Sequence, residues 1–160
     1  MPRNVPVRSR RVLIMVGLIT SLLVGGVLFY LSTRPVDGTD VTDAALVERG
    51  RTLYQTHCAS CHGADLAGQP NWKERLPSGL LPAPPHDASG HTWHHPDPLL
   101  FKMVKDGGAS VLLPGEVSGM PAYGSFLSDE DIWAMLSYIK STWPADIQQR
   151  QSDVTRQSPR

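Results

Sequence analysis

The chain has 160 residues, with 15 lysines and arginines against 15 aspartates and glutamates, and only two cysteines. The balanced charge argues against a nucleic-acid-binding surface, and two cysteines cannot build a disulfide framework. The charge is unevenly spread, because four arginines precede residue 12 and residues 32–160 carry a net charge of −4.

The first predicted element is an apolar helix over residues 12–31. This stretch carries no charge, and as a helix it would be about 30 Å long, which matches the hydrocarbon core of a bilayer. The basic residues before it favour a cytoplasmic N-terminus over residues 1–11 and export of everything after Leu31. No small-x-small cleavage site follows, so we expect an uncleaved transmembrane signal-anchor, with a cleaved signal peptide as the alternative.

The exported part is expected to be one small domain between two polar segments. Residues 32–41 are predicted to be a linker, residues 42–144 the domain, and residues 145–160 a polar, disordered tail with little to bury. A domain core of this size is marginal by itself, so a buried cofactor would supply much of the missing apolar volume.

The first helix of the domain is predicted to begin at Thr42 and Asp43, which are good N-cap residues, and to run through both cysteines. Gly50 lies on its apolar face together with Tyr54. A glycine inside a helix costs about 1 kcal/mol relative to alanine, so we expect a second helix to approach closely at this position.

The helix is predicted to end in Cys58-Ala59-Ser60-Cys61-His62, the C-x-x-C-H signature of covalent haem attachment. Cys58 and Cys61 lie three residues apart, so both thiols can form thioethers with one porphyrin, and His62 can offer an imidazole nitrogen to the iron. A redox-active dithiol and half of a zinc site are the alternatives, but no other cysteine exists and no strand pattern flanks the motif. We expect one haem c with His62 as its proximal iron ligand.

The segment between residues 63 and 98 contains seven prolines, which exclude a long helix or a central strand. It also contains four histidines, which are His86, His91, His94 and His95. They could bind copper or zinc, or one of them could ligate the haem iron. Because no cysteine or carboxylate partners stand at fixed spacing, we favour loop histidines and no second metal site.

Two further helices are predicted after this segment. The first covers residues 97–106 and ends at Gly107. The second begins at the capping residue Ser128, is stopped by Pro144, and has a buried stripe of Ile132, Met135, Leu136 and Ile139. The residue pattern therefore predicts an all-α fold with long loops.

Together these features resemble a class I (monohaem) c-type cytochrome over nearly all of residues 43–143. Gly50 and Tyr54 stand where this family has a glycine and an aromatic residue, and the last helix resembles the one that crosses the first at that glycine. The resemblance implies a small cytochrome c fold, with three to four helices and long loops around one haem. The anchor and the stretch over residues 90–96 resemble a bacterial subgroup, which implies the inner (cytoplasmic) membrane and a periplasmic haem domain.

Residues 119–123 (GMPAY) resemble the loop that supplies the distal methionine of this family. Pro121 favours an extended conformation at Met120, so that its sulfur could reach the iron on the face opposite the proximal histidine. Met103 and Met135 fall on apolar helix faces and are expected in the core. We therefore expect Met120 to be the distal iron ligand, with bis-histidine ligation as the alternative.

The resemblance implies one-electron transfer between two redox proteins by a membrane-tethered carrier in a respiratory chain, not an enzyme. No serine–histidine pair, paired carboxylates or phosphate-binding loop indicates bond chemistry. Two alternatives stay open. One is a cytochrome c subunit of a membrane oxidase or dehydrogenase complex, and the other is a haem-based gas or redox sensor in which Met120 dissociates.

Overall fold

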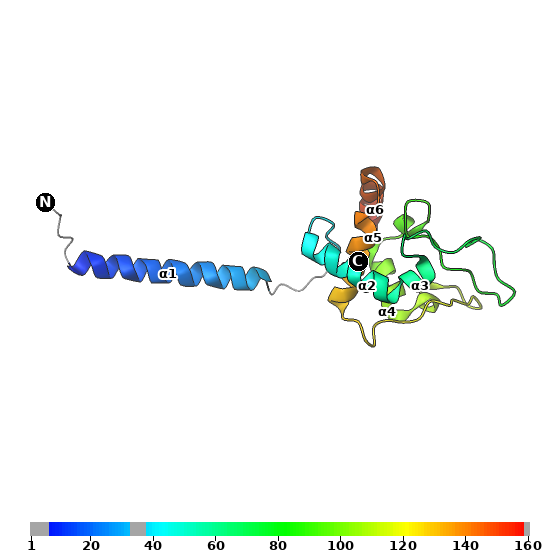
Figure 1. Ribbon diagram of the computed structural model, residues 1–160, viewed down its shortest axis with the longest axis horizontal. Coiled ribbons are helices and arrows are strands. Elements are labelled where there is room, and N and C mark those ends of the chain that lie inside the picture. The colour runs from blue at the N-terminus through cyan, green and yellow to red at the C-terminus, as the bar shows by residue number, and fades with distance from the viewer. Residues whose placement is uncertain (1–6, 33–37, 159–160) are drawn as a thin grey trace. The chain divides into compact units, whose positions relative to one another are not determined.

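The computed structural model describes residues 7–32 and 38–158, and the chain divides into two units between Pro35 and Val36 (Figure 1). The first unit contains one helix, α1 (Val7–Ser32), whose described apolar side chains are exposed. Within the described residues, no helix is both long and apolar enough to cross a membrane. Part of the predicted N-terminal segment (residues 1–6) and half of the predicted linker (residues 33–37) lie outside the described residues.

In the second unit, the residues that the structure describes form helices joined by long loops, and none of them forms a strand. This agrees with the predicted all-α fold. Its elements in chain order are α2 (Ala44–His57), α3 (Ala59–His62), η1 (Thr92–His94), α4 (Asp97–Asp106), η2 (Gly108–Val111), α5 (Asp129–Ser141) and α6 (Ala145–Gln157), as Figure 1 shows.

Side-chain caps set the starts of α2 and α5, as predicted. The carboxylate of Asp43 accepts hydrogen bonds from two backbone N–H groups in the first turn of α2. Ser128 and Asp131 form a reciprocal capping box at the start of α5, which satisfies two backbone donors that the helix leaves unpaired. The fourth helix covers the predicted residues 97–106 and ends at Gly107, whose φ of 85° is accessible to glycine without strain.

Helices α2 and α5 pack against each other at Gly50. Gly50 is buried, and a Cβ atom at this position would overlap the backbone carbonyl of Ala134. The missing side chain therefore allows the two backbones to touch, which confirms the predicted close approach of a second helix.

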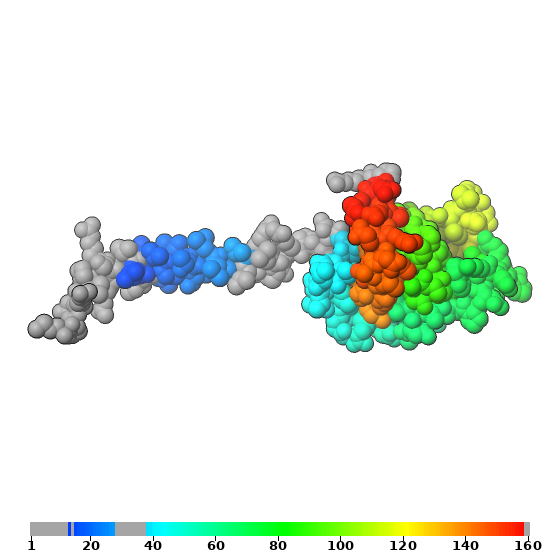
Figure 2. All heavy atoms as spheres, turned by 90° about the horizontal axis from the view of Figure 1, so that it is seen from above, coloured from blue at the N-terminus to red at the C-terminus, as the bar shows by residue number. Residues whose placement is uncertain are grey.

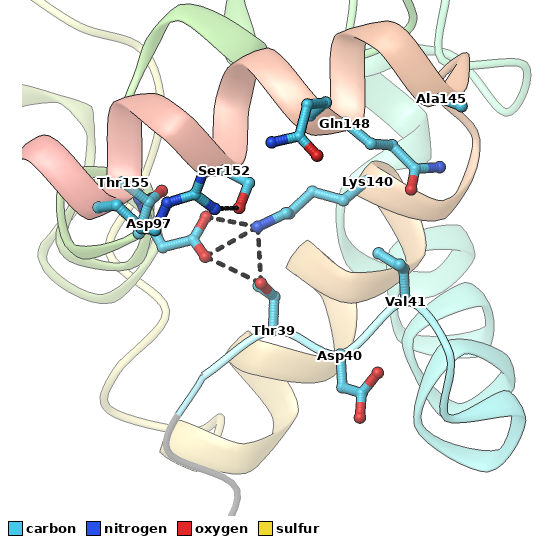
Figure 3. Close-up of a pocket in the computed structure, with 11 residues that line it drawn as sticks. Thr39, Asp40, Val41, Asp97, Lys140, Ala145, Gln148, Ser152 and Thr155 are labelled. Carbon is cyan, nitrogen blue, oxygen red and sulfur yellow. Dashed lines mark hydrogen bonds and ion pairs between the residues drawn. The ribbon is translucent and has the colours of Figure 1, made fainter.

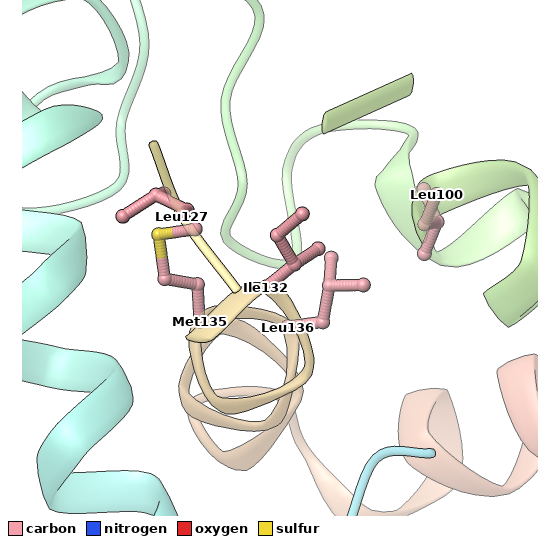
Figure 4. Packing of buried hydrophobic residues seen from close by; sticks show 5 residues of the cluster. All are labelled: Leu100, Leu127, Ile132, Met135 and Leu136. Atoms are coloured by element: carbon pink, nitrogen blue, oxygen red, sulfur yellow. The ribbon is translucent and has the colours of Figure 1, made fainter. Parts of the chain in front are cut away.

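Two hydrophobic clusters form the core, and Cys58 packs against both of them. Figure 4 shows the first cluster, in which Leu100 of α4 faces residues of α5; its members are Leu100, Leu127, Ile132, Met135 and Leu136. The second cluster consists of Tyr54, Leu66, Ile139 and Trp143. The C-x-x-C-H motif therefore begins where the two clusters meet.

Helix α6 occupies residues for which a disordered tail was expected, so that prediction is wrong for residues 145–157. Its Gln151 is 0% exposed, and the side-chain amide donates to the Asp97 carboxylate at 2.6 Å and to the His95 carbonyl at 3.1 Å. Figure 2 shows α6 as a ridge across one face of the second unit. The helix is docked through a polar side chain, which a search for apolar stripes does not detect.

Asp97 also joins α4 to α5 through a largely buried ion pair (Figure 3). The Lys140 ammonium lies 2.8 Å from both Asp97 carboxylate oxygens and 2.6 Å from the Thr39 hydroxyl. These groups border a polar cavity of about 420 Å³, which Gln148, Ser152 and other residues of α6 also line. No cysteine or histidine lines this cavity, so it is separate from the C-x-x-C-H motif.

Candidate functional site

The C-x-x-C-H motif forms a turn of its own at the end of α2. The predicted helix does not run unbroken through the cysteines, because α2 ends at His57 and the short helix α3 begins at Ala59. The Cys58 carbonyl accepts hydrogen bonds from the backbone N–H groups of Cys61 at 3.1 Å and His62 at 2.9 Å. The three residues of the predicted haem site therefore lie on one hydrogen-bonded turn, as their spacing predicts.

The two thiols lie in different surroundings. Cys58 is half-buried, and its sulfur is 3.8 Å from the sulfur of Met135 in the core, whereas Cys61 is exposed. Burial, together with the nearby Cys61 thiol, raises the pKa of Cys58 to about 11. Thioredoxin-like dithiols depend on a cysteine whose pKa is lowered, so this environment disfavours the redox-dithiol alternative.

The His62 side chain is buried and held by a backbone carbonyl. It is 8% exposed, and its Nδ1 lies 2.9 Å from the carbonyl oxygen of Pro84, to which the Nδ1–H group donates. Among the described residues, no hydrogen bond engages its Nε2 atom. Burial lowers the pKa of His62, while the hydrogen bond to Pro84 opposes this shift. The ring is therefore a neutral imidazole whose second nitrogen is available for a metal.

Sequence reasoning did not identify Pro84 as the partner of His62. The carbonyl lies 22 residues beyond the histidine, within the proline-rich segment. The backbone N–H of Gly68 donates to the His62 carbonyl, and that of Gln69 donates to the Ala83 carbonyl, so residues 63–69 lead back alongside the irregular stretch before Pro84. This folding of the loop brings the Pro84 carbonyl to His62, and no local sequence pattern indicates the contact.

These residues fit a covalently attached haem. Two thiols for thioether bonds and a neutral imidazole with a free Nε2 stand on one turn, and the backbone of that turn is fixed. The buried Tyr54 hydroxyl donates to the Gly63 carbonyl at 3.0 Å and thereby ties the end of the motif to α2. A zinc site fits less well, because within the described residues no three His, Cys, Asp or Glu side chains converge to hold a metal ion.

The histidines of the proline-rich segment contact aromatic rings. His86 stacks on His62 with ring centres 4.0 Å apart, and His94 stacks on Trp93 at 3.7 Å. His91 stacks on the Trp72 ring at 5.1 Å. Each of these three histidine rings therefore packs against a different partner.

Met120 lies in the irregular segment between η2 and α5, and it is half-buried. Its backbone is held by two contacts: its N–H donates to the Ser118 hydroxyl at 3.1 Å, and its carbonyl accepts from the Gly108 N–H at 3.1 Å. The Tyr123 hydroxyl donates to the His57 carbonyl at 3.0 Å, which attaches the same segment to the residue before Cys58.

The structure thus brings the Met120 segment to the motif through Tyr123, but no described contact joins the Met120 side chain to His62. The other methionines differ in burial. Met135 is 1% exposed and belongs to the core, as predicted, and Met103 is half-buried on α4.

The chain is similar to known proteins along most of the second unit. A family model described as Cytochrome c matches residues 47–143. The chain is 30% identical to the Cbb3-type cytochrome c oxidase subunit CcoP of Azospirillum brasilense over 99 residues, which cover 61% of this chain and 29% of that protein. It is 32% identical to cytochrome c-555 of Prosthecochloris aestuarii over 80 residues, which cover 46% of this chain and 80% of that protein.

A third relative is the cytochrome bc1 complex cytochrome c subunit of Mycobacterium bovis, which is 40% identical over 55 residues. This match covers 34% of the chain and 20% of the relative. The chain therefore spans less than a third of the length of this protein and of CcoP.

Proposed function

Because the match covers more than half of its residues, the chain belongs to the cytochrome c family, and we propose that it carries single electrons through one haem c ligated by His62 and Met120. Its relatives are named as a cytochrome c-555 and as cytochrome c subunits of a Cbb3-type oxidase and of a bc1 complex, and the family binds its haem covalently. The proposal assigns the thioether bonds to Cys58 and Cys61.

The observation that carries this proposal is the state of His62. A buried, neutral imidazole whose Nδ1–H group is held by a backbone carbonyl presents its Nε2 lone pair in one direction. The bound haem supplies a one-electron Fe(III)/Fe(II) couple. Met120, as the second protein ligand of the iron, would raise the reduction potential relative to a second histidine and would keep other ligands away from the iron.

The packing around the motif suits a carrier whose site changes little during electron transfer. Cys58 packs against two core clusters, and the Tyr54 hydroxyl holds the Gly63 carbonyl at 3.0 Å. A site that is held by the core moves little between oxidation states, and small movement favours rapid electron transfer.

Visible spectra of the holoprotein, made in cells that attach haem c, test the proposed ligation. We expect a six-coordinate spectrum, a weak far-red methionine–iron band in the oxidised protein, and no response of the reduced protein to CO. Met120→Ala should keep the haem attached but bind CO, and the matched control Met103→Ala should not bind it. Rapid CO binding by the wild-type protein would contradict the carrier proposal and favour the sensor alternative.

The proposal includes a membrane tether that places the haem domain in the periplasm of a bacterium. Its support is the uncharged sequence of residues 12–31, the arginines before it, and the exposed apolar side chains of α1, such as Leu22, which is 75% exposed. A tether raises the effective concentration of the domain near membrane-bound redox partners.

The alternative of a complex subunit has specific support, because two relatives are named as subunits of a Cbb3-type oxidase and of a bc1 complex. Mild detergent extraction followed by native sizing separates the two functions. A tethered carrier should migrate alone in its detergent micelle, and a subunit should migrate together with other polypeptides. Recovery in the aqueous fraction without detergent would contradict both.

A further inference from the structure

The His86 ring covers one face of the His62 ring. The ring centres are 4.0 Å apart, and the planes are inclined by 22°, which is a stacked arrangement. His86 also follows Pro84, whose carbonyl holds the Nδ1 atom of His62, by only two residues. One short segment therefore contacts His62 both at its edge and on its face.

The surrounding structure fixes His86 itself. Its Nδ1 lies 2.9 Å from the Thr92 hydroxyl, and its backbone N–H donates to the Leu66 carbonyl at 2.8 Å. Its carbonyl accepts a hydrogen bond of 2.7 Å from the indole N–H of Trp143, which is 3% exposed and belongs to the second core cluster. Both ends of the residue and its ring are therefore held by packed neighbours.

The two contacts on His62 restrain different motions. A single hydrogen bond at Nδ1 fixes the direction of that N–H group but allows the ring to rotate about the line that joins Nδ1 to the Pro84 oxygen. A flat ring packed against its face opposes this rotation, because an inclined imidazole would collide with His86 or lose contact with it.

We propose that His86 is a positioning residue that fixes the plane of the His62 imidazole and thereby the orientation of the proximal ligand on the haem iron. This inference rests on the proposed role of His62 as that ligand. The plane of an axial imidazole determines how the iron d orbitals split, which the g values of the oxidised protein and the shifts of its haem methyl protons report. His86 also keeps water from this face of His62, which favours a higher reduction potential.

Substitutions in the full-length holoprotein test the proposal by EPR, proton NMR and redox titration. His86→Leu should shift the g values and the haem methyl resonances and lower the midpoint potential, because it removes the flat ring. His86→Phe keeps a flat ring without the hydrogen bond to Thr92 and should restore most of the wild-type signals. The control His94→Leu removes an exposed histidine that stacks on Trp93, and it should leave all three readouts unchanged.

Thr92→Val provides a second test that keeps the His86 ring and does not depend on the folding of His86→Leu. It removes the hydroxyl that holds the ring, so we expect shifts in the same direction but smaller. Wild-type g values in His86→Leu would overturn the positioning role, and so would equal shifts in His86→Leu and His86→Phe. If His86→Leu fails to fold, wild-type signals in Thr92→Val would overturn it. A wild-type protein without a low-spin haem would instead contradict the proposed function itself.

Discussion

The two predicted iron ligands lie in regions that are built differently. The His62 side chain is 8% exposed, its Nδ1 is held by Pro84, and its ring is covered by His86. Met120 is half-buried, its backbone makes two hydrogen bonds, and it lies in a segment whose Leu113 is 74% exposed. Segments with few buried contacts open at a lower free energy than the core. The Met120 segment should therefore open at a lower free energy than the turn that carries His62.

The difference originates in what each region packs against. The turn that carries His62 follows the end of α2, which packs against α5, and it begins at Cys58, which contacts both core clusters. The Met120 segment is joined to the domain through Tyr123, whose partly buried ring packs against the first cluster and whose hydroxyl donates to the His57 carbonyl next to the motif. Substitutions in the two regions should therefore affect different properties.

The largest effect on stability is expected for Gly50→Ala, in the helix α2 that leads to the turn of His62. A Cβ atom would overlap the Ala134 carbonyl, so α2 and α5 must separate, and we expect a loss of about 2–3 kcal/mol in the free energy of unfolding. Denaturant unfolding of the holoprotein measures this loss. Gly38→Ala is the matched control, because nothing lies within 4 Å of a Cβ there, and its unfolding free energy should stay at the wild-type value.

A smaller loss of stability is expected for Tyr54→Phe. The Tyr54 ring is 0% exposed, and burial raises the pKa of its hydroxyl, which stays protonated as the donor to Gly63. Its removal takes away one of the two hydrogen bonds that the Gly63 carbonyl accepts, the other coming from the Leu66 N–H, and should cost about 1–1.5 kcal/mol of unfolding free energy. The rate at which external imidazole binds to the oxidised protein should not change. A marked increase in this rate would show that the two regions do not open independently.

Tyr123→Phe makes the same chemical change on the Met120 side. The hydroxyl is only partly buried, so we expect a loss of about 0.5–1 kcal/mol of unfolding free energy. Because the hydrogen bond to His57 holds the Met120 segment to the motif, imidazole binding should become roughly fivefold faster. Stopped-flow mixing measures the rate, and equal rates in Tyr54→Phe and Tyr123→Phe would contradict the comparison.

The smallest effect concerns the pH dependence of the α2–α5 pair. Partial burial would raise the pKa of Asp131, but hydrogen bonds from the Ser128 hydroxyl and backbone N–H and from the Arg49 guanidinium hold it below its ordinary value of 3.8. The carboxylate therefore stabilises the fold at pH values above 3.8, and this contribution is lost as the pH falls through the lowered pKa.

Asp131→Asn should reduce the free energy of unfolding by about 0.5 kcal/mol at pH 7, because the Arg49 side chain of this pair is 49% exposed and water screens the interaction. Urea unfolding at a series of pH values should show that the difference from the wild-type protein shrinks below pH 3.8. A difference that persists undiminished at lower pH would show that the charge of Asp131 is not its cause.

The sequence predicted the elements whose causes are local. The caps at Asp43 and Ser128, the fourth helix over residues 97–106, and the close approach at Gly50 each follow from a few neighbouring residues. The placing of Cys58, Cys61 and His62 on one turn follows in the same way from their spacing.

Contacts between distant segments were not predictable in this manner. The Pro84 carbonyl and the His86 ring reach His62 only because the proline-rich segment folds back on the motif. Helix α6 was missed because a buried amide, Gln151, and its bond to Asp97 dock it in place of an apolar stripe. The break in the first helix at Cys58 depends on the same kind of tertiary packing, since this residue lies between two clusters.

Proton NMR of the reduced holoprotein tests the central claim most directly, because a methionine methyl group on the iron lies over the porphyrin and its signal moves far upfield. We predict one such signal in the wild-type protein, its loss in Met120→Ala, and its retention in Met103→Ala and Met135→Ala. A wild-type spectrum without this signal, or a signal that persists in Met120→Ala, would contradict ligation by His62 and Met120.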